Sequence, residues 1–296
     1  MSAGPSRLPR SAGRTAFASL PPAGLPGMDA RFSRLVEVSG GDSGRPVTWH
    51  VLDNAAVLEQ LGVTPVGTML CVHGNPTWSY LWRGLVTAAT DAAAVAADTG
   101  SGEVWRVLAV DQLEMGFSER TGSERALTRR VTDLSALTDT LELSGPVVTV
   151  GHDWGGVVSM GWAVDHPDSL AGVVLLNTAI HQPESRAIPW PLRLALQRGV
   201  LGRATVATPA FLETTLALAH PALSADVKNG YRAPYRTADR RGGIGAFVAD
   251  IPVDESHESW NELERIAAGV RELGVPSLLL WGPRDPIFSD VYLDDL

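Results

Sequence analysis

The sequence has few of the residues that stabilise small secreted folds and little positive charge. Its 296 residues include one cysteine, Cys71, and one lysine, Lys228. A single thiol forms neither an intrachain disulfide nor a multi-thiolate metal site, so the core must hold the fold and a reducing compartment, the cytoplasm, is expected. A formal net charge of -9 leaves no broad basic field for nucleic acid or an anionic membrane surface.

Long apolar runs are missing as well. No window of about 18 uninterrupted apolar residues occurs, so we expect no transmembrane segment. Residues 1–30 are crowded with Pro, Gly, Ala, Ser and Arg, and they lack the apolar core of about 7 to 15 residues that a signal peptide needs. We therefore predict a disordered lead-in over residues 1–30.

From Ser33 onward, short apolar runs alternate with longer helix-like stretches. This alternation predicts an α/β fold, a mostly parallel sheet with helices on both faces. The predicted strands are residues 35–38, 47–52, 68–72, 107–110, 147–150, 173–176 and 277–281.

About 100 residues separate the last two predicted strands, whereas an ordinary loop has about 2 to 6 residues. The gap predicts an inserted helical cap over residues 183–255, between a first part of the core at 31–182 and a return to the core at 256–296. Helix-like segments in this part of the chain are residues 192–197, 210–218 and 259–273.

The most specific motif is GHDWGG at residues 151–156, between a predicted strand and an apolar helix. This context matches the nucleophile elbow G-x-S-x-G, with Asp153 in the place of serine. Glycines on either side allow a strained turn to pack against its neighbours. We expect the helix N-terminus to keep Asp153 ionised. The alternative is a simple capping aspartate.

A second motif, HGNP at residues 73–76, follows the predicted strand 68–72. The nucleophile-elbow fold places its second oxyanion donor there. We predict that the backbone N–H groups of Asn75 and Trp154 form an oxyanion hole. The side chain of His73 is expected to shape the loop rather than to transfer protons.

A third candidate is Asp285, which follows the predicted strand 277–281. Open α/β sheets collect their ligands at this edge, so Asp285 is predicted to be the acid that orients a histidine. The alternative is a turn aspartate, because Asp-Pro is common in turns.

The expected chain order of nucleophile, acid and base requires a histidine after Asp285. All seven histidines precede it: His50, His73, His152, His166, His181, His220 and His257. His152 is expected to point away from the elbow site and His257 to lie on the surface. A further helix and strand would need about 30 more residues. We therefore predict a fragment without its C-terminal strand and helix, with the general base after Leu296.

With these motifs the sequence resembles the α/β-hydrolase superfamily, in its haloalkane dehalogenase-like branch. The matching runs are HGNPTWSYLWR at 73–83, DQLEMGFS at 111–118 and HDWGG at 152–156. The resemblance implies that Asp153 attacks carbon to give a covalent ester, which a histidine-activated water cleaves. It also implies that the Trp154 indole N–H and the Asn75 amide hold a departing halide, with no cofactor or metal.

Two runs, VDQLEMGFSER at 110–120 and WGPRDPIFSD at 281–290, resemble the N-terminal domain of actinobacterial olefin-biosynthesis fusion proteins. That resemblance implies a β-lactone decarboxylase, which converts a long-chain dialkyl β-lactone to a cis-alkene. It also implies a small hydrophobic substrate and a fused or associated β-lactone synthetase. Asn177 departs from the dehalogenase pattern, because some dehalogenases keep a carboxylate there.

Three alternatives remain open. A haloalkane dehalogenase fits the same motifs. An epoxide hydrolase would use two cap tyrosines, for which Tyr231 and Tyr235 are available, although its loop usually carries an aromatic residue in place of Asn75. A non-catalytic hydrolase-like binding module is favoured by the missing histidine and disfavoured by the intact Asp153 and Trp154.

Overall fold

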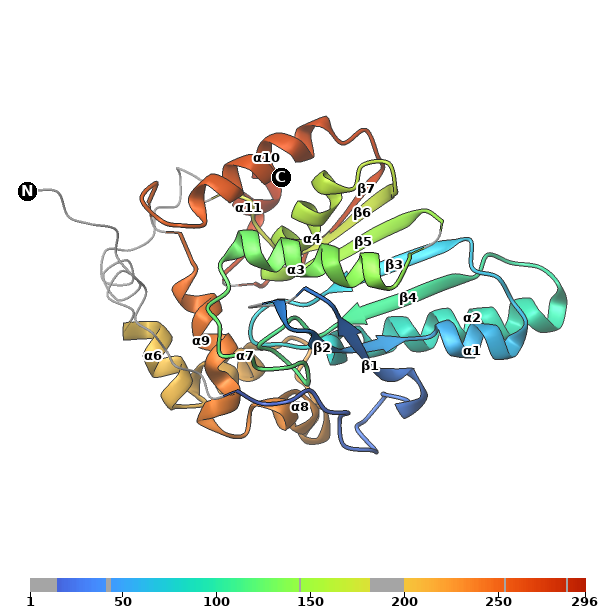
Figure 1. The fold of residues 1–296 in the computed structure, drawn as a ribbon, viewed down its shortest axis with the longest axis horizontal. Coiled ribbons are helices and arrows are strands. Elements are labelled where there is room, and N and C mark those ends of the chain that lie inside the picture. The colour runs from blue at the N-terminus through green and yellow to red at the C-terminus, as the bar shows by residue number, and fades with distance from the viewer. Residues whose placement is uncertain (1–14, 41–43, 144, 182–199, 253, 286) are drawn as a thin grey trace, which may run out of the picture.

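The computed structural model describes residues 15–40, 44–143, 145–181, 200–252, 254–285 and 287–296. A seven-stranded sheet lies between two layers of helices (Figure 1). The strand order is β1-β2-β4-β3-β5-β6-β7, in which β2 pairs antiparallel with β1 and β4 and the other pairs are parallel. The strands are β1 Ser33–Val38, β2 Val47–Asp53, β3 Gly67–Val72, β4 Trp105–Val110, β5 Val147–His152, β6 Leu170–Leu176 and β7 Ser277–Leu280.

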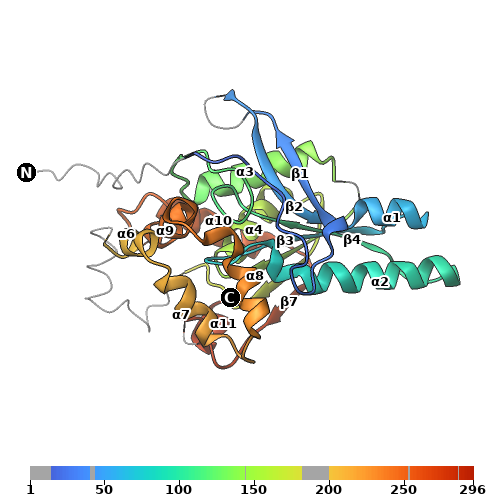
Figure 2. The same ribbon diagram turned by 90° about the horizontal axis from the view of Figure 1, so that it is seen from below.

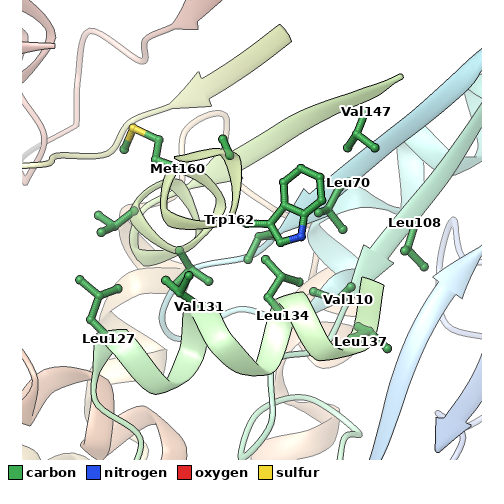
Figure 3. Close-up of a cluster of buried hydrophobic side chains, with 14 of the residues drawn as sticks. Leu70, Leu108, Val110, Leu127, Val131, Leu134, Leu137, Val147, Met160 and Trp162 are labelled. Carbon is green, nitrogen blue, oxygen red and sulfur yellow. The ribbon is translucent and has the colours of Figure 1, made fainter. Parts of the chain in front are cut away.

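All seven predicted strands are confirmed. The apolar runs that predicted the central strands supply side chains to both faces of the sheet. Leu70 and Val72 of β3 face one helix layer, and Cys71 between them faces the other. Figure 3 shows the first of these cores, where helix α3 packs against the sheet and against Trp162. Helices on this face are α3 Leu127–Thr140, α4 Trp154–Asp165 and α10 Trp260–Glu272, and those on the other are α1 Ala55–Leu61 and α2 Arg83–Thr99.

Residues 200–252 form the helical insert, which lies at the carboxyl ends of the parallel strands, lower left in Figure 1. A third hydrophobic core, besides the two on the faces of the sheet, lies under the insert. It joins insert residues such as Phe247 to Trp78 and Phe117 in the loops after β3 and β4. The predicted helix at 210–218 is observed as α7, while the one at 192–197 lies outside the described residues. The insert contains α6 Val200–Ala207, α7 Ala210–Leu218, α8 Ala225–Arg232, η5 Ala233–Tyr235, η6 Ala238–Arg241 and α9 Gly242–Ala249.

The prediction of a disordered lead-in is wrong for residues 15–30. Ala16 pairs with Arg120 through two backbone hydrogen bonds of 2.9 and 2.8 Å. The Tyr80 hydroxyl donates to the Pro26 carbonyl at 2.6 Å, and Met28 packs against the core of the insert. Composition alone could not reveal these partners, because they lie far away in the sequence. Figure 2 shows this blue segment running beside the sheet.

Strand β7 forms one edge of the sheet, and the side chains of Leu278 and Leu280 are 51% and 47% exposed. Helix α10 precedes this strand and helix α11, Asp290–Asp295, follows it. Exposed apolar strand edges favour pairing with another strand. No helix in the described part of the chain is long and apolar enough to cross a membrane.

Candidate active site

Asp153 lies at the sharp turn between β5 and α4, with φ 53° and ψ -131°. A positive φ is costly for a residue with a side chain, and such strain concentrates at functional sites. The turn needs glycine on both sides: a Cβ at Gly155 would lie 2.1 Å from the Val72 carbonyl oxygen, and one at Gly151 would lie 2.4 Å from Ser159 Oγ. The predicted elbow geometry is therefore present.

The Asp153 carboxylate is held by the loop after β3 and by the first residue of α4. The backbone N–H of Asn75 donates to its Oδ1 at 2.6 Å, and the backbone N–H of Trp154 also hydrogen-bonds the carboxylate. In the described part of the chain, the carboxylate makes no N-cap hydrogen bond to an N–H further along α4. The structure thus brings together the three residues predicted for the nucleophile and the oxyanion hole, in an arrangement unlike that of a simple capping aspartate.

Burial raises the pKa of Asp153 to about 7, against the effect of the two N–H groups, and the charge of Asp285 adds to the rise. This rise opposes the expected effect of the helix N-terminus, which favours the ionised form of Asp153. Two neutral donors offset only part of the desolvation, and the negative charge of Asp285 adds to it. Asp153 titrates near neutrality, which is typical of groups that act in catalysis.

Asp285 lies at the same edge of the sheet, in the loop after β7. Its Oδ1 accepts hydrogen bonds from the backbone N–H groups of Ile287 at 2.7 Å and Phe288 at 3.0 Å. Its charge acts on both Asp153 and His152. Asp285 therefore has the turn contacts of the alternative interpretation and is also close enough to influence the nucleophile position electrostatically.

Asn177, which we read from the sequence only as a departure from a pattern, links these two parts of the site. Its backbone carbonyl accepts the N–H of Asp153 at 3.1 Å, and its side-chain Oδ1 accepts the N–H of Gly282 at 2.8 Å. One residue after β6 therefore ties the elbow to the loop of Asp285. Its place directly after a central strand was the only sequence signal for this role.

The side chains of Asn75 and Trp154 border the helical insert. Asn75 Nδ2 donates to the Ile244 carbonyl of α9 at 3.2 Å, and the Trp154 ring lies 5.6 Å from that of Phe247 in the same helix. Among the described residues, no hydrogen bond engages the Trp154 indole N–H.

Most histidine rings are occupied by other partners. Hydrogen bonds join His50 to Asp111 and Ser33, His73 to Gly74 and Gln112, His166 to Trp162, His181 to Asp295, His220 to Arg284, and His257 to Ala249 and Ser259. Within the described ranges, His152 Nδ1 is buried without a partner, and burial lowers the pKa of His152 to about 4. A general base after Leu296 stays a prediction.

His73 is fully buried beside the site and acts on the loop. Its Nδ1 bonds to the Gly74 carbonyl at 2.8 Å, so this nitrogen carries the proton and donates. Its Nε2 then accepts the backbone N–H of Gln112 at 3.1 Å. Burial lowers the pKa of His73, which keeps the ring neutral and both of its nitrogens engaged.

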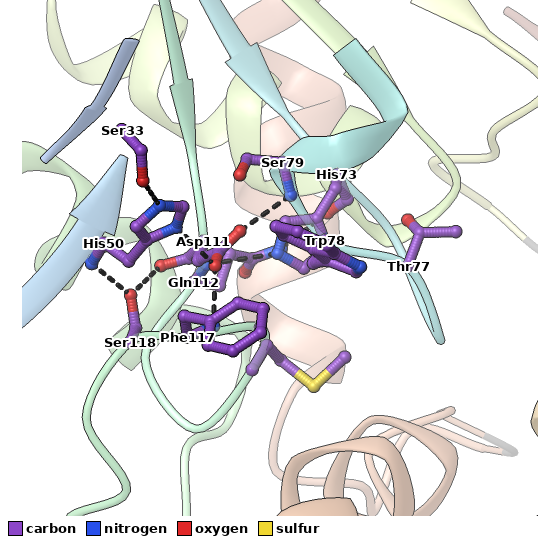
Figure 4. A network of polar contacts seen from close by, with 12 residues as sticks. Ser33, His50, His73, Thr77, Trp78, Ser79, Asp111, Gln112, Phe117 and Ser118 are labelled. Atoms are coloured by element: carbon purple, nitrogen blue, oxygen red, sulfur yellow. Dashed lines mark hydrogen bonds and ion pairs between the residues drawn. The ribbon is translucent and has the colours of Figure 1, made fainter. Parts of the chain in front are cut away.

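Sequence reasoning missed the central role of Asp111, which directly follows β4 (Figure 4). Its Oδ1 accepts the backbone N–H of Ser79 at 2.7 Å, and its Oδ2 accepts that of Phe117 at 2.7 Å. His50 Nδ1 lies 2.8 Å from the same Oδ2, and its Nε2 lies 2.7 Å from Ser33 Oγ. Burial opposes ionisation here, but the His50 ring and the other donors outweigh it and lower the pKa of Asp111.

The family model for the alpha/beta hydrolase fold matches residues 67–296. The chain belongs to the α/β hydrolase fold family. A cis-3-alkyl-4-alkyloxetan-2-one decarboxylase from Shewanella oneidensis is 30% identical to this hydrolase over 233 residues, covering 76% of the chain and 69% of the relative. A protein of the same name from Xanthomonas campestris is 29% identical over 243 residues, covering 76% and 75%. Haloalkane dehalogenase 2 from Mycobacterium tuberculosis is 32% identical over 228 residues, covering 74% and 71%.

Solved structures agree on the fold. A haloalkane dehalogenase from Paraglaciecola agarilytica has a TM-score of 0.74 at 20% identity, covering 95% of this chain and 87% of the other. One from Agrobacterium tumefaciens has a TM-score of 0.65 at 22% identity, covering 88% and 83%. The predicted fold class and the resemblance to the dehalogenase-like branch are confirmed.

Proposed function

We propose that this α/β hydrolase uses Asp153 as a carbon-directed nucleophile and decarboxylates a dialkyl β-lactone to a cis-alkene. The observation that carries the proposal is the strained Asp153 carboxylate, held by backbone N–H groups of Asn75 and Trp154 and titrating near neutrality. Two relatives at 29% and 30% identity are named as decarboxylases of cis-3-alkyl-4-alkyloxetan-2-ones, which are β-lactones. Their names support the choice of substrate.

In the first step, one carboxylate oxygen of Asp153 attacks the ring carbon that bears the ring oxygen. The bond between that carbon and oxygen breaks, and the ring oxygen leaves as part of a carboxylate that stays attached to the substrate. The indole N–H of Trp154, which no described residue engages, is placed to donate to this new carboxylate. No proton moves in this step.

In the second step the substrate carboxylate leaves as carbon dioxide. Its electron pair forms the double bond, and the bond from carbon to the Asp153 oxygen breaks, so the free aspartate is regenerated. The N–H groups of Asn75 and Trp154 stabilise the returning negative charge. Inversion in the first step followed by anti elimination converts a cis-lactone into a cis-alkene. This route consumes no water.

Haloalkane dehalogenation is the second candidate, supported by the 32% identity to a haloalkane dehalogenase. Asp153 would displace a halide, and water would then have to cleave the resulting ester. The epoxide alternative is less well supported, because the tyrosine hydroxyls are occupied. Tyr235 donates to the Thr77 carbonyl at 2.7 Å, and Tyr231 hydrogen-bonds Arg83.

The two candidates differ in the source of oxygen. We would incubate the purified protein in ¹⁸O-water with a cis-dialkyl β-lactone or a 1-haloalkane, and measure alkene, halide and the mass of the peptide that contains Asp153. The decarboxylase proposal expects cis-alkene without ¹⁸O in Asp153, whereas hydrolysis of an ester labels the carboxylate. Asp153→Asn should abolish the reaction, and the exposed Asp91→Asn in α2 is the matched control. Alkene formation by Asp153→Asn at the wild-type rate would contradict the proposal.

A β-lactone synthetase, fused or associated, remains the partner that we propose. The reasoning is chemical: a strained four-membered lactone must be supplied by an enzyme that closes the ring. Co-purification of such an activity with the native protein would test it, and a native protein that makes alkene only from added lactone would count against it.

A further inference from the structure

Hydrogen bonds tie the loop after β3 to the helical insert along its length. Asn75 Nδ2 donates to the Ile244 carbonyl at 3.2 Å, and Trp78 Nε1 donates to the Gly230 carbonyl at 3.2 Å. Between these two contacts, the Thr77 carbonyl accepts the Tyr235 hydroxyl at 2.7 Å. The loop that carries the oxyanion donor is therefore held against residues far away in the sequence.

Tyr235, which makes the middle one of these contacts, is 1% exposed. Its hydroxyl also accepts the backbone N–H of Gly116, in the loop after β4, at 3.0 Å. The same oxygen thus binds both loops that flank the site, one as donor and one as acceptor. Removing it would take this partner away from the Thr77 carbonyl and from the buried Gly116 N–H, which is costly.

A short chain of contacts leads from this hydroxyl to the nucleophile. Both the backbone N–H and the Oγ1 of Thr77 donate to the Gly74 carbonyl at 3.0 Å, which closes a tight turn. Asn75 follows Gly74, and its N–H donates to Asp153 at 2.6 Å. A shift of Thr77 therefore moves the donor that holds the carboxylate.

We infer that Tyr235 is a positioning residue, whose hydroxyl keeps the Asn75 N–H on the Asp153 carboxylate by fixing Thr77 and Gly116. The inference rests on the proposed nucleophilic role of Asp153, and it applies to a lactone and a haloalkane alike. Displacement of a catalytic group by about 1 Å can reduce a rate by about a hundredfold, so a single hydroxyl at this place has a measurable effect.

The test compares Tyr235→Phe with Tyr80→Phe. The control also loses one tyrosine hydroxyl. Tyr80 lies in the loop after β3, but its hydroxyl donates at 2.6 Å to the carbonyl of Pro26, which belongs to neither loop. Both variants should lower the melting temperature. Only Tyr235→Phe should slow formation of the Asp153 adduct or of alkene, about tenfold or more, with KM little changed.

The pH profile of kcat/KM distinguishes a positioning role from a purely structural one, because a purely structural role would leave the profile unchanged. The Asn75 N–H lowers the pKa of Asp153, so Tyr235→Phe should shift the acidic limb of kcat/KM to higher pH. The other charged or titratable groups near the carboxylate, Asp285, His152 and His73, are the same in both variants. Equal rates and equal pH profiles in the two variants would overturn the inference.

Hydrogen exchange of residues 73–79 tests the inference without activity. Tyr235→Phe should reduce protection of this segment, and Tyr80→Phe should leave it close to wild type. Unchanged protection in Tyr235→Phe overturns the positioning role. Wild-type protein that reacts with neither substrate, while its loop still responds to Tyr235→Phe, counts against the proposed function and leaves the positioning of the loop supported.

Discussion

Two aspartates follow the strands on either side of β3, and they have opposite properties. Asp111 accepts two backbone N–H groups and faces the His50 ring, so its pKa is lowered although it is fully buried. Asp153 also accepts two backbone N–H groups, but burial, with a further contribution from the charge of Asp285, raises its pKa to about 7. Burial opposes the ionisation of both carboxylates, and the two differ in whether the groups around them outweigh that burial.

This difference indicates a structural role for Asp111 and a reactive role for Asp153. Asp111 stays ionised and joins β2 to the loops after β3 and β4, so it contributes to stability (Figure 4). Asp153 has a raised pKa, to which the charge of Asp285 contributes, and is held in a strained conformation. Its carboxylate is a poor structural anchor and a reactive group.

Asp153→Asn is expected to have the largest effect. Turnover of the lactone, or adduct formation with a haloalkane, should fall by at least about four orders of magnitude because the nucleophile is lost. Circular dichroism should show an unchanged fold. Activity within tenfold of wild type would remove Asp153 from the site.

Asp111→Asn should have the opposite effect to Asp153→Asn, because it should lower the stability of the fold. The change weakens a buried, charge-assisted network and places an NH₂ group beside backbone donors, so we expect a loss of about 3 to 5 kcal/mol in the free energy of unfolding. Urea denaturation measures it. Leu35→Ala, at an exposed position of β1, is the control. A loss below about 1 kcal/mol would show that Asp111 is not the hub we describe.

The dependence on pH sharpens the comparison. The rate of the step in which Asp153 attacks should rise about tenfold per pH unit below its pKa and level off above pH 7.

Asp153 binds its proton more tightly when the protein is folded, so its ionisation destabilises the fold progressively up to pH 7. Asp153→Asn should therefore gain about 2 to 3 kcal/mol of stability relative to wild type between pH 5 and pH 7. The lowered pKa of Asp111 has the opposite sign: its stabilisation is present above the ordinary aspartate pKa and is lost as pH falls further.

Stability measured at several pH values between 4 and 8 checks the sign for Asp153, and measurements below pH 4 check the sign for Asp111. A stability difference between wild type and Asp153→Asn that stays constant over this range would contradict the raised pKa.

Asn75→Ala should have the smallest effect and should separate the two substrates. A halide must be held as it departs, whereas the lactone carboxylate stays attached to the substrate, so the haloalkane step should slow about tenfold more than lactone opening. Parallel rate measurements on both substrates test this. Equal losses would show that the Asn75 side chain acts through the loop, where it binds the Ile244 carbonyl.

The sequence by itself determined the seven strands, the elbow and the presence of an insert. These features depend on local apolar runs, on glycine spacing around Asp153 and on the long gap before β7, all of which can be read along the chain. The tertiary structure alone decided which groups surround each aspartate. Asn75 lies 78 residues from Asp153, and Tyr235 lies 158 residues from Thr77. Ionisation, loop position and the order of residues 15–30 depend on such distant partners, because a pKa or a buried hydrogen bond is set by everything that packs around the group.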